Sequence, residues 1–290
     1  MEGSLQEEPR SRKVWLIEVS HIIKGAVLGS PVEHSLSPLL HREAFDFLGI
    51  AGEYNRQEVA LESLAQFFDS QSANFDYFSI TMPLKEEALT LPVVVDPLAL
   101  RIQSSNTLYK RGDQWHLTST DGSGLISALK HEGYISFKRA LVLGAGGTAR
   151  AVVGALDGVA DEIVVLGRTS TRRDVLESAV ERSIFDYERW NDAPDFASYD
   201  LVVNTTPAGA ADLLAESLSP GECSLFFDVI YKPWPTVLGS RWADSGGFVI
   251  NGIELLLYQG IQQLSLALGK QLDELALATH LRPILKKAIR

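Results

Sequence analysis

The stretch that indicates the fold most clearly is Arg139-Ala-Leu-Val-Leu-Gly-Ala-Gly-Gly-Thr-Ala-Arg150. It begins as an apolar run typical of a buried strand, and residues 151–156 continue it with helical character. Glycines between a strand and a helix allow a tight turn, and they let the backbone approach a pyrophosphate at the helix N-terminus. The third small residue is Ala149, so the motif departs from G-x-G-x-x-G. In this context we predict nucleotide binding, with a plain glycine-rich connector as the alternative.

The end of the next predicted strand indicates which dinucleotide is bound. An acidic residue at this point favours NAD, whereas an arginine accommodates the 2′-phosphate of NADP. After Leu166 the sequence has no acidic residue until Asp174. For a phosphate, Arg168 offers a planar guanidinium with several N–H donors, Thr169 offers a hydroxyl, and Arg172 offers a second positive charge. We therefore predict NADP, with a solvated basic turn as the alternative.

Around this unit, strand and helix patterns alternate along the chain, which is typical of a parallel sheet covered on both faces. The length of 290 residues suggests about two domains. We therefore expect two α/β domains. The expected strands are 24–29, 54–59, 77–81, 139–143, 161–166, 199–204, 224–230 and 247–250, with a hairpin around 111–113. The expected helices are 39–48, 61–69, 86–91, 151–156, 176–181, 253–268 and 272–287.

Composition limits the classes of function. The net charge of −11 argues against a nucleic-acid partner, and it means that an anionic ligand needs local positive charge inside a cleft. The six histidines show no metal-site spacing, so we expect no metal. Cys223 is the only cysteine, so no internal disulfide can form, and a reducing compartment such as the cytoplasm fits.

The sequence also gives no sign of membrane insertion. No run reaches the ~18 apolar residues of a membrane span. The apolar patch at 14–17 is interrupted by Glu18, and we predict no signal peptide there. The first dozen residues are polar and charged, and we expect them to form a mobile tail. The oligomeric state is left open, and a homodimer is the assembly to test.

Two hydroxyls in the first half are candidates for a carboxylate site. Ser35 and Ser37 follow a predicted strand and are two residues apart. In an extended or turn segment, alternate side chains point the same way, so both can converge on one carboxylate. Because Pro38 follows, Ser37 also suits the cap of a helix, and a capping role is the alternative.

A lysine and an aspartate are candidates for acid–base chemistry. Lys85 follows a predicted strand end and the proline turn at Pro83. Asp121 lies in residues 118–124, which we expect to form a flexible turn at the domain junction. A nearby carboxylate would keep Lys85 cationic and oriented. A lysine so placed can move the proton that accompanies a hydride in a hydroxyl-to-carbonyl reaction. A solvated surface lysine is the alternative.

Taken in order, these segments resemble the shikimate dehydrogenase family. The resemblance covers roughly residues 24–265, and each motif is weak alone, whereas the ordered set is specific. The matching motifs are H-S-x-S-P at 34–38, T-x-P-x-K at 81–85, N-T at 106–107, T-D-G at 120–122, G-A-G-G at 144–147, R-T at 168–169, N-T-T-P-x-G at 204–209, D-x-x-Y-x-P at 228–233 and a Gln in the helix after Asn251-Gly252.

The resemblance implies a role for each matching residue. Lys85 and Asp121 would form the catalytic pair. The substrate-binding residues would be Ser35, Ser37 and Tyr231 at the carboxylate, Thr81 in the ring pocket, and Asn106 and Gln259 at ring hydroxyls. The cofactor-binding residues would be Gly144, Gly146, Gly147 and Thr148 at the pyrophosphate, Arg168, Thr169 and Arg172 at the 2′-phosphate, Asn204 and Thr205 along the nucleotide, and Gly252 near the nicotinamide.

The resemblance also implies a domain arrangement and a reaction. Residues 1–120 plus 253–290 would form the substrate domain and residues 121–252 a Rossmann-type NADP domain, with the active site between them. The expected reaction is the NADP-dependent interconversion of 3-dehydroshikimate and shikimate, in the pathway to chorismate and the aromatic amino acids.

Two further readings remain open. Ser79 and Ser119 stand where the family usually has asparagine, which affects affinity and the choice among related polyols more than the reaction type. A quinate or aminoshikimate dehydrogenase is one alternative, although Ser37 and Arg168 argue against it. A catalytically weak paralogue that senses NADP or a shikimate-like ligand is the other.

Overall fold

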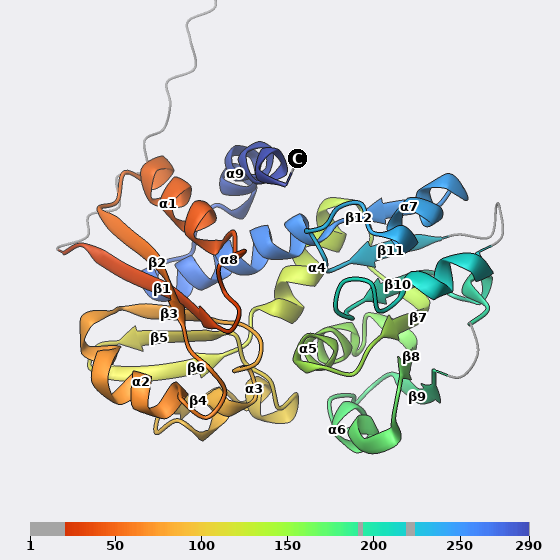
Figure 1. The fold of residues 1–290 in the computed structure, drawn as a ribbon, viewed down its shortest axis with the longest axis horizontal. Helices are drawn as coiled ribbons and strands as arrows, with labels where there is room; N and C mark the ends of the chain where they lie inside the picture. Colours follow the sequence, from red (N-terminus) through yellow and green to blue (C-terminus); the bar gives the residue numbers. More distant parts are fainter. Residues whose placement is uncertain (1–20, 191–193, 219–223, 290) are drawn as a thin grey trace, which may run out of the picture.

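The computed structural model describes residues 21–190, 194–218 and 224–289. The predicted N-terminal tail, the apolar patch at 14–17 and Cys223 lie outside these residues. The described chain contains two six-stranded sheets with helices packed around and between them (Figure 1). The predicted α/β fold class is confirmed.

The first sheet has the strand order β2-β1-β3-β5-β6-β4. Its strands are β1 (Ile23–Gly29), β2 (Gly52–Glu58), β3 (Tyr77–Ile80), β4 (Val94–Val95), β5 (Thr107–Arg111) and β6 (Gln114–Thr118). β1 pairs in parallel with β2 and β3, whereas β5 is antiparallel to β3 and β6. The predicted hairpin joins β5 to β6, and Gly112 takes a positive φ of 58° in its turn. The sheet is therefore mixed, because this hairpin adds an antiparallel pair to the βαβ part.

The second sheet has the strand order β12-β11-β10-β7-β8-β9, and every neighbouring pair is parallel. Its strands are β7 (Phe137–Leu143), β8 (Ala160–Gly167), β9 (Ile184–Arg189), β10 (Leu201–Asn204), β11 (Leu225–Asp228) and β12 (Phe248–Ile250). The sequence analysis did not predict β9, a run of six residues of which three are charged, and most of its side chains are exposed or half-buried. This edge strand forms only because β8 provides its hydrogen-bonding partner.

The helices are α1 (Ser37–Leu48), α2 (Leu64–Gln71), α3 (Pro97–Arg101), α4 (Asp121–His131), α5 (Gly147–Leu156), α6 (Arg173–Glu177), α7 (Val237–Asp244), α8 (Gly252–Leu268) and α9 (Glu274–Ala288). Two expectations are corrected. Residues 118–124 are not a flexible turn, because α4 begins at Asp121 and packs against α5 and α8. The helix predicted at 176–181 lies earlier, as α6, and residues 173–177 are its helical part.

The inner faces of the two sheets share one continuous apolar core. Leu125 of α4, Val152 of α5 and Leu257 of α8 are fully buried in it. The outer face of each sheet is covered by a smaller apolar cluster of its own. In Figure 1, α4 and α8 run through the middle of the molecule between the two sheets. Among the described residues, no helix combines the length and the apolar character that crossing a bilayer requires.

Candidate active site

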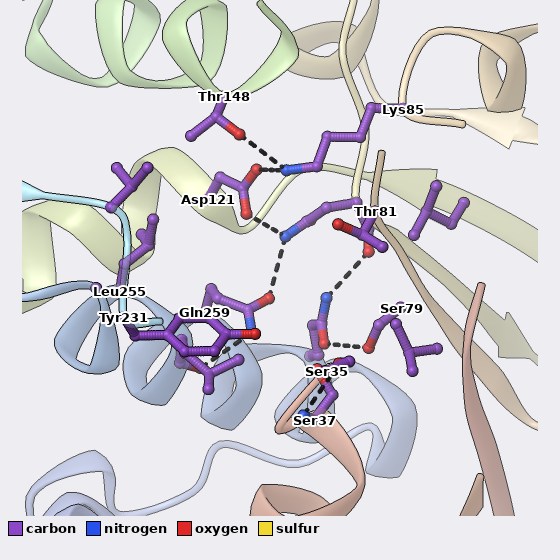
Figure 2. A pocket seen from close by; sticks show the side chains of 17 residues that line it. Ser35, Ser37, Ser79, Thr81, Lys85, Asp121, Thr148, Tyr231, Leu255 and Gln259 are labelled. Atoms are coloured by element: carbon purple, nitrogen blue, oxygen red, sulfur yellow. Dashed lines mark hydrogen bonds and ion pairs between the residues drawn. The ribbon is translucent and has the colours of Figure 1, made fainter. Parts of the chain in front are cut away.

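A pocket of about 160 Å³ is lined by residues from both halves of the chain (Figure 2). The carboxyl ends of β1 and β3, the start of α4, the start of α5 and one face of α8 all contribute to its wall. Ten of the predicted site residues line it, namely Ser35, Ser37, Thr81, Lys85, Asn106, Asp121, Thr148, Tyr231, Gly252 and Gln259.

Lys85 and Asp121 form an ion pair at one side of this pocket. The side chains are 15% and 8% exposed, so the pair is largely shielded from water. Lys85 Nζ also donates to Thr148 Oγ1 over 3.2 Å, which brings the first turn of α5 against the lysine. The two groups predicted to share a pocket therefore do so, and a residue of the glycine-rich turn lies beside them.

Asn106 orients the aspartate from the opposite side. Its amide nitrogen donates to Asp121 Oδ1 over 2.7 Å and to Gln259 Oε1 over 3.2 Å. Its side-chain oxygen Oδ1 accepts the backbone N–H of Thr120 over 2.7 Å. Since Asn106 is only 2% exposed, this network holds one carboxylate oxygen of Asp121 away from Lys85 and leaves the other for the ion pair.

Sequence reasoning gave no role to Gln263, which also lines the pocket. Its amide nitrogen donates to the carbonyl oxygen of Asn106 over 3.0 Å, and its oxygen accepts the hydroxyl of Ser79. Gln263 comes one helical turn after Gln259, and both are buried in α8. Two glutamines spaced i, i+4 in a mostly apolar helix lie on one face, and this spacing is a sequence signal that could have identified it.

The two serines lie across the pocket from Lys85 (Figure 2). The helix cap is Leu36, and Ser37 is the first residue of α1, followed by Pro38. Ser35 Oγ accepts the backbone N–H of Ser37 over 3.2 Å, so Ser35 satisfies part of the helix start. Both serines still line the pocket, and capping and ligand contact are therefore compatible for Ser35.

Tyr231 also lines the pocket, in the segment between β11 and α7. Burial raises the pKa of its phenol above the usual value. The neutral hydroxyl therefore persists at physiological pH and can donate a hydrogen bond.

The glycine-rich turn has the geometry that the sequence predicted. Gly144 takes a φ of 103°, a backbone conformation that residues with a side chain rarely adopt. Its N–H donates to the carbonyl of Leu166. α5 begins at Gly147 with Gly146 as its cap, and no side chain caps its first N–H groups. Gly144, Gly146 and Gly147 do not line the pocket, although Thr148, the next residue, does.

The other cofactor candidates lie outside the pocket wall. Arg168, Thr169 and Arg172 are exposed directly after β8. The guanidinium of Arg172 donates to Glu86 over 3.0 Å and to the carbonyl of Ala145 over 3.3 Å. These three residues therefore lie at the same edge of the sheet as the glycine-rich turn, because β7 and β8 are parallel neighbours.

Asn204 ends β10 at that same edge and Thr205 follows it, but their side chains bind other parts of the protein. The Asn204 amide donates to Asp228 Oδ1 over 3.0 Å, and Thr205 Oγ1 donates to the carbonyl of Leu143 over 2.7 Å. Burial raises the pKa of Asp228. The Thr205 N–H also donates to the carbonyl of Leu143, and the carbonyl of Asn204 accepts the N–H of Val229, so both residues shape this edge of the sheet.

Gly252 occupies a position that only glycine fits. A Cβ there would collide with the carbonyl of Val229, and the Gly252 N–H donates to Ile230 over 3.2 Å. This close approach brings the start of α8 against the segment after β11, next to the pocket.

Comparisons with known proteins agree with this geometry. Residues 27–108 match the family described as the shikimate dehydrogenase substrate binding domain. The chain is 31% identical over 261 residues to the shikimate dehydrogenase (NADP(+)) of Staphylococcus aureus strain MSSA476, covering 87% of this chain and 94% of that protein.

Solved structures extend the similarity to the fold of both halves. The crystal structure of Mycobacterium tuberculosis shikimate dehydrogenase has a TM-score of 0.80 at 32% identity, covering 90% of this chain and 99% of that one. The Thermus thermophilus shikimate 5-dehydrogenase in complex with NADP(H) and shikimate has a TM-score of 0.78 at 31% identity, covering 90% and 99%. With its paired Lys85 and Asp121, its glycine-rich turn and this extent of similarity, the chain belongs to the shikimate dehydrogenase family.

Proposed function

We propose that this protein is an NADP-dependent shikimate dehydrogenase, which interconverts 3-dehydroshikimate and shikimate in the pathway to chorismate and the aromatic amino acids. The observation that carries the proposal is the shielded ion pair of Lys85 and Asp121 in a pocket lined by hydroxyl and amide groups. The similarity to the NADP(+)-dependent shikimate dehydrogenase of Staphylococcus aureus and to the Thermus thermophilus enzyme in complex with NADP(H) and shikimate supports it.

In this proposal, residues 1–120 and 253–290 form the substrate domain and residues 121–252 the cofactor domain. The separate sheets β1–β6 and β7–β12 support this division. So does the contact of α8 with α1 and β5, since it returns the end of the chain to the first sheet.

The residues after β7 and β8 fit NADP. The first N–H groups of α5 have no side-chain cap, and the side of Gly146 on which a Cβ would lie is open to at least 4 Å, so a pyrophosphate can approach them. Gly144, Gly147 and Thr148 complete this turn, with the backbone of Asn204 and Thr205 beside it. Arg168, Thr169 and Arg172 would hold the 2′-phosphate, and Gly252 would lie near the nicotinamide. When bound, NADPH supplies the hydride for the reduction.

The protein's own residues handle the proton. During reduction, Lys85 Nζ donates a proton to the carbonyl oxygen, which becomes the hydroxyl of shikimate, and in the reverse direction Nζ accepts it. Asp121 keeps the lysine charged and in place through the ion pair, and Asn106 fixes the carboxylate. Because both side chains are largely shielded from water, the proton transfer takes place in an ordered environment.

The opposite side of the pocket binds the rest of the substrate. Ser35, Ser37 and Tyr231 provide three hydroxyl groups for the carboxylate. Gln259 and Asn106 lie between this side and Lys85, where they can bind ring hydroxyls, and Thr81 lines the ring pocket. A carboxylate held at one end and a reacting oxygen at the other would fix the orientation of the ring.

Steady-state initial rates of the purified chain test the proposal. We expect reduction of NADP with shikimate to be faster than reduction of NAD, and faster than either reaction with quinate. A higher rate with quinate would instead support the quinate alternative. Ligand binding with almost no turnover would support a sensor and overturn the proposed activity.

The cytoplasmic location and a homodimer belong to the same proposal. The single cysteine supports a reducing compartment. Fractionation of cells that produce the full chain tests the location, and light scattering of the purified protein tests the dimer.

A further inference from the structure

Glu86 comes directly after Lys85, but its carboxylate is bound from the other half of the molecule. Its Oε1 accepts Arg150 Nη2 over 2.8 Å and Arg172 Nη1 over 3.0 Å. Arg150 belongs to α5, and Arg172 ends the 3₁₀ turn Ser170–Arg172 that follows β8. One carboxylate oxygen thus joins the loop of the proposed catalytic lysine to two arginines of the proposed cofactor domain.

The two arginines differ in how firmly they are held. The side chain of Arg150 is 2% exposed, and it also donates to the carbonyls of Ile102 and Gln103 over 2.9 and 2.8 Å. The side chain of Arg172 is 45% exposed, and its other contact is the 3.3 Å bond to Ala145. Arg150 is therefore a fixed anchor for Glu86, whereas Arg172 can exchange partners.

Glu86 is charged in this arrangement. Burial is the largest single influence and opposes ionisation, but hydrogen bonds and charge from Arg150 and Arg172 together lower the pKa of the carboxyl below its usual value. A phosphate that binds Arg172 must therefore compete with an ionised carboxylate for the same guanidinium.

We propose that Glu86 is a specificity-determining residue that competes with the 2′-phosphate of the cofactor for Arg172. The inference rests on the proposed function, which assigns Arg172 to that phosphate. Without cofactor, Glu86 holds Arg172 against the glycine-rich turn. When the phosphate takes Arg172, Glu86 stays with Arg150. Glu86 thus weakens phosphate recognition and reduces the preference for NADP over NAD.

Binding of adenosine 2′,5′-bisphosphate and of 5′-AMP, measured by calorimetry on the full chain, tests this without turnover. Glu86→Gln keeps an oxygen acceptor for both arginines but removes the charge. Since exposed ion pairs are weak, we expect the bisphosphate to bind about two- to fivefold more tightly to Glu86→Gln than to the parent. The affinity for 5′-AMP should not change, because it has no 2′-phosphate.

Two further variants separate the contact from a general effect of charge. Glu177→Gln removes a carboxylate that pairs with Arg173 instead, and it should leave both affinities unchanged. In an Arg172→Gln background, Glu86→Gln should no longer tighten bisphosphate binding. If Glu86→Gln does not fold, Glu86→Asp keeps the charge near the fixed Arg150 but withdraws it from Arg172, and we expect the same direction of change.

Equal bisphosphate affinity in the parent, Glu86→Gln and Glu86→Asp would overturn the inference. So would an equal gain in Glu177→Gln. If the assignment of NADP as the cofactor is wrong, the result is distinguishable. The parent would then bind the bisphosphate no more tightly than 5′-AMP, and it would oxidise shikimate no faster with NADP than with NAD.

Discussion

At the residue scale, the proposed chemistry depends on an ammonium group whose neighbours fix its position. Lys85 has Asp121 on one side and Thr148 on the other, and Asn106 holds the aspartate. A single lysine thus joins three elements, namely the loop after β3, the start of α4 and the start of α5.

Replacing this lysine tests its proposed role as proton carrier. We expect Lys85→Ala to lower kcat by roughly 10²-fold or more, because no other lysine or histidine of the described residues lines the pocket. Steady-state kinetics with shikimate and NADP measure this, and Lys130→Ala, at an exposed position on α4, is the control. Turnover equal to that of the parent would show that Lys85 is not the proton carrier.

A buried histidine gives the fold a pH dependence. His41 lies fully inside the first half, stacked on Tyr54, and burial lowers its pKa from 6.5 to about 3. Between these pH values the unfolded chain binds a proton that the folded chain does not. The free energy of unfolding therefore falls as pH drops from 6.5 toward 3, by up to about 1.4 kcal/mol per pH unit from this residue.

Denaturant unfolding of the parent and His41→Phe across this range measures the effect. The variant keeps the aromatic stack but cannot titrate, so its free energy of unfolding should fall less steeply with decreasing pH. Identical slopes would mean that His41 has the same pKa in the folded and the unfolded chain, which would contradict the lowered pKa.

At the element scale, the site depends on how closely α4 and α5 approach each other. Gly122 follows Asp121, and a Cβ at this position would lie 2.5 Å from the carbonyl oxygen of Ala151 and 2.8 Å from Ala155 Cβ. The absence of a side chain therefore lets the helix that carries the aspartate pack directly on the helix of the glycine-rich turn.

Adding one methyl group tests this contact. We expect Gly122→Ala to lower the free energy of unfolding by about 1–3 kcal/mol, because the helices must separate. It should also lower kcat, because Asp121 moves with α4. Chemical denaturation and steady-state kinetics measure both, with Lys130→Ala, at an exposed position of the same helix, as the control. Parent-like values in both assays would argue against the tight contact.

Most of the elements could be predicted, and two of the exceptions depend on tertiary contacts. The strand and helix around the glycine-rich turn form β7 and α5, because a buried apolar run and a glycine turn act locally. The elements that were not predicted are the short β4, α3 and α7, the edge strand β9 and the helix α4. Of these, β9 needs β8 as a partner, and the first residues of α4 resemble a turn until they pack against α8.

At the scale of the whole molecule, Arg150 connects the two halves. It lies in α5, yet it donates to the carbonyls of Ile102 and Gln103, just before Asn106 of the pocket. Its position between the halves is possible because these carbonyls and Glu86 satisfy the buried guanidinium.

Removing this guanidinium should loosen the junction. We expect Arg150→Met to lower the free energy of unfolding by about 1–3 kcal/mol, because two buried carbonyls lose their donors. Hydrogen exchange should become faster in residues 102–106. Arg139→Met, which removes a partly exposed pair with Glu162, is the control, with an expected change below about 1 kcal/mol. Unchanged exchange in 102–106 would contradict this role of Arg150.

The sequence alone determined the strand–turn–helix unit, the chemical type of the candidate residues and, through their order, the family. These depend on neighbouring residues, because a turn, a cap or a short motif is formed by a few consecutive positions. Only the tertiary structure decided that Lys85 contacts both Asp121 and Thr148, that Gln263 completes the amide network from α8, and that Glu86 shares Arg172 with the proposed phosphate site. Contacts between distant positions form only when the two sheets pack on one core, and no local pattern records that packing.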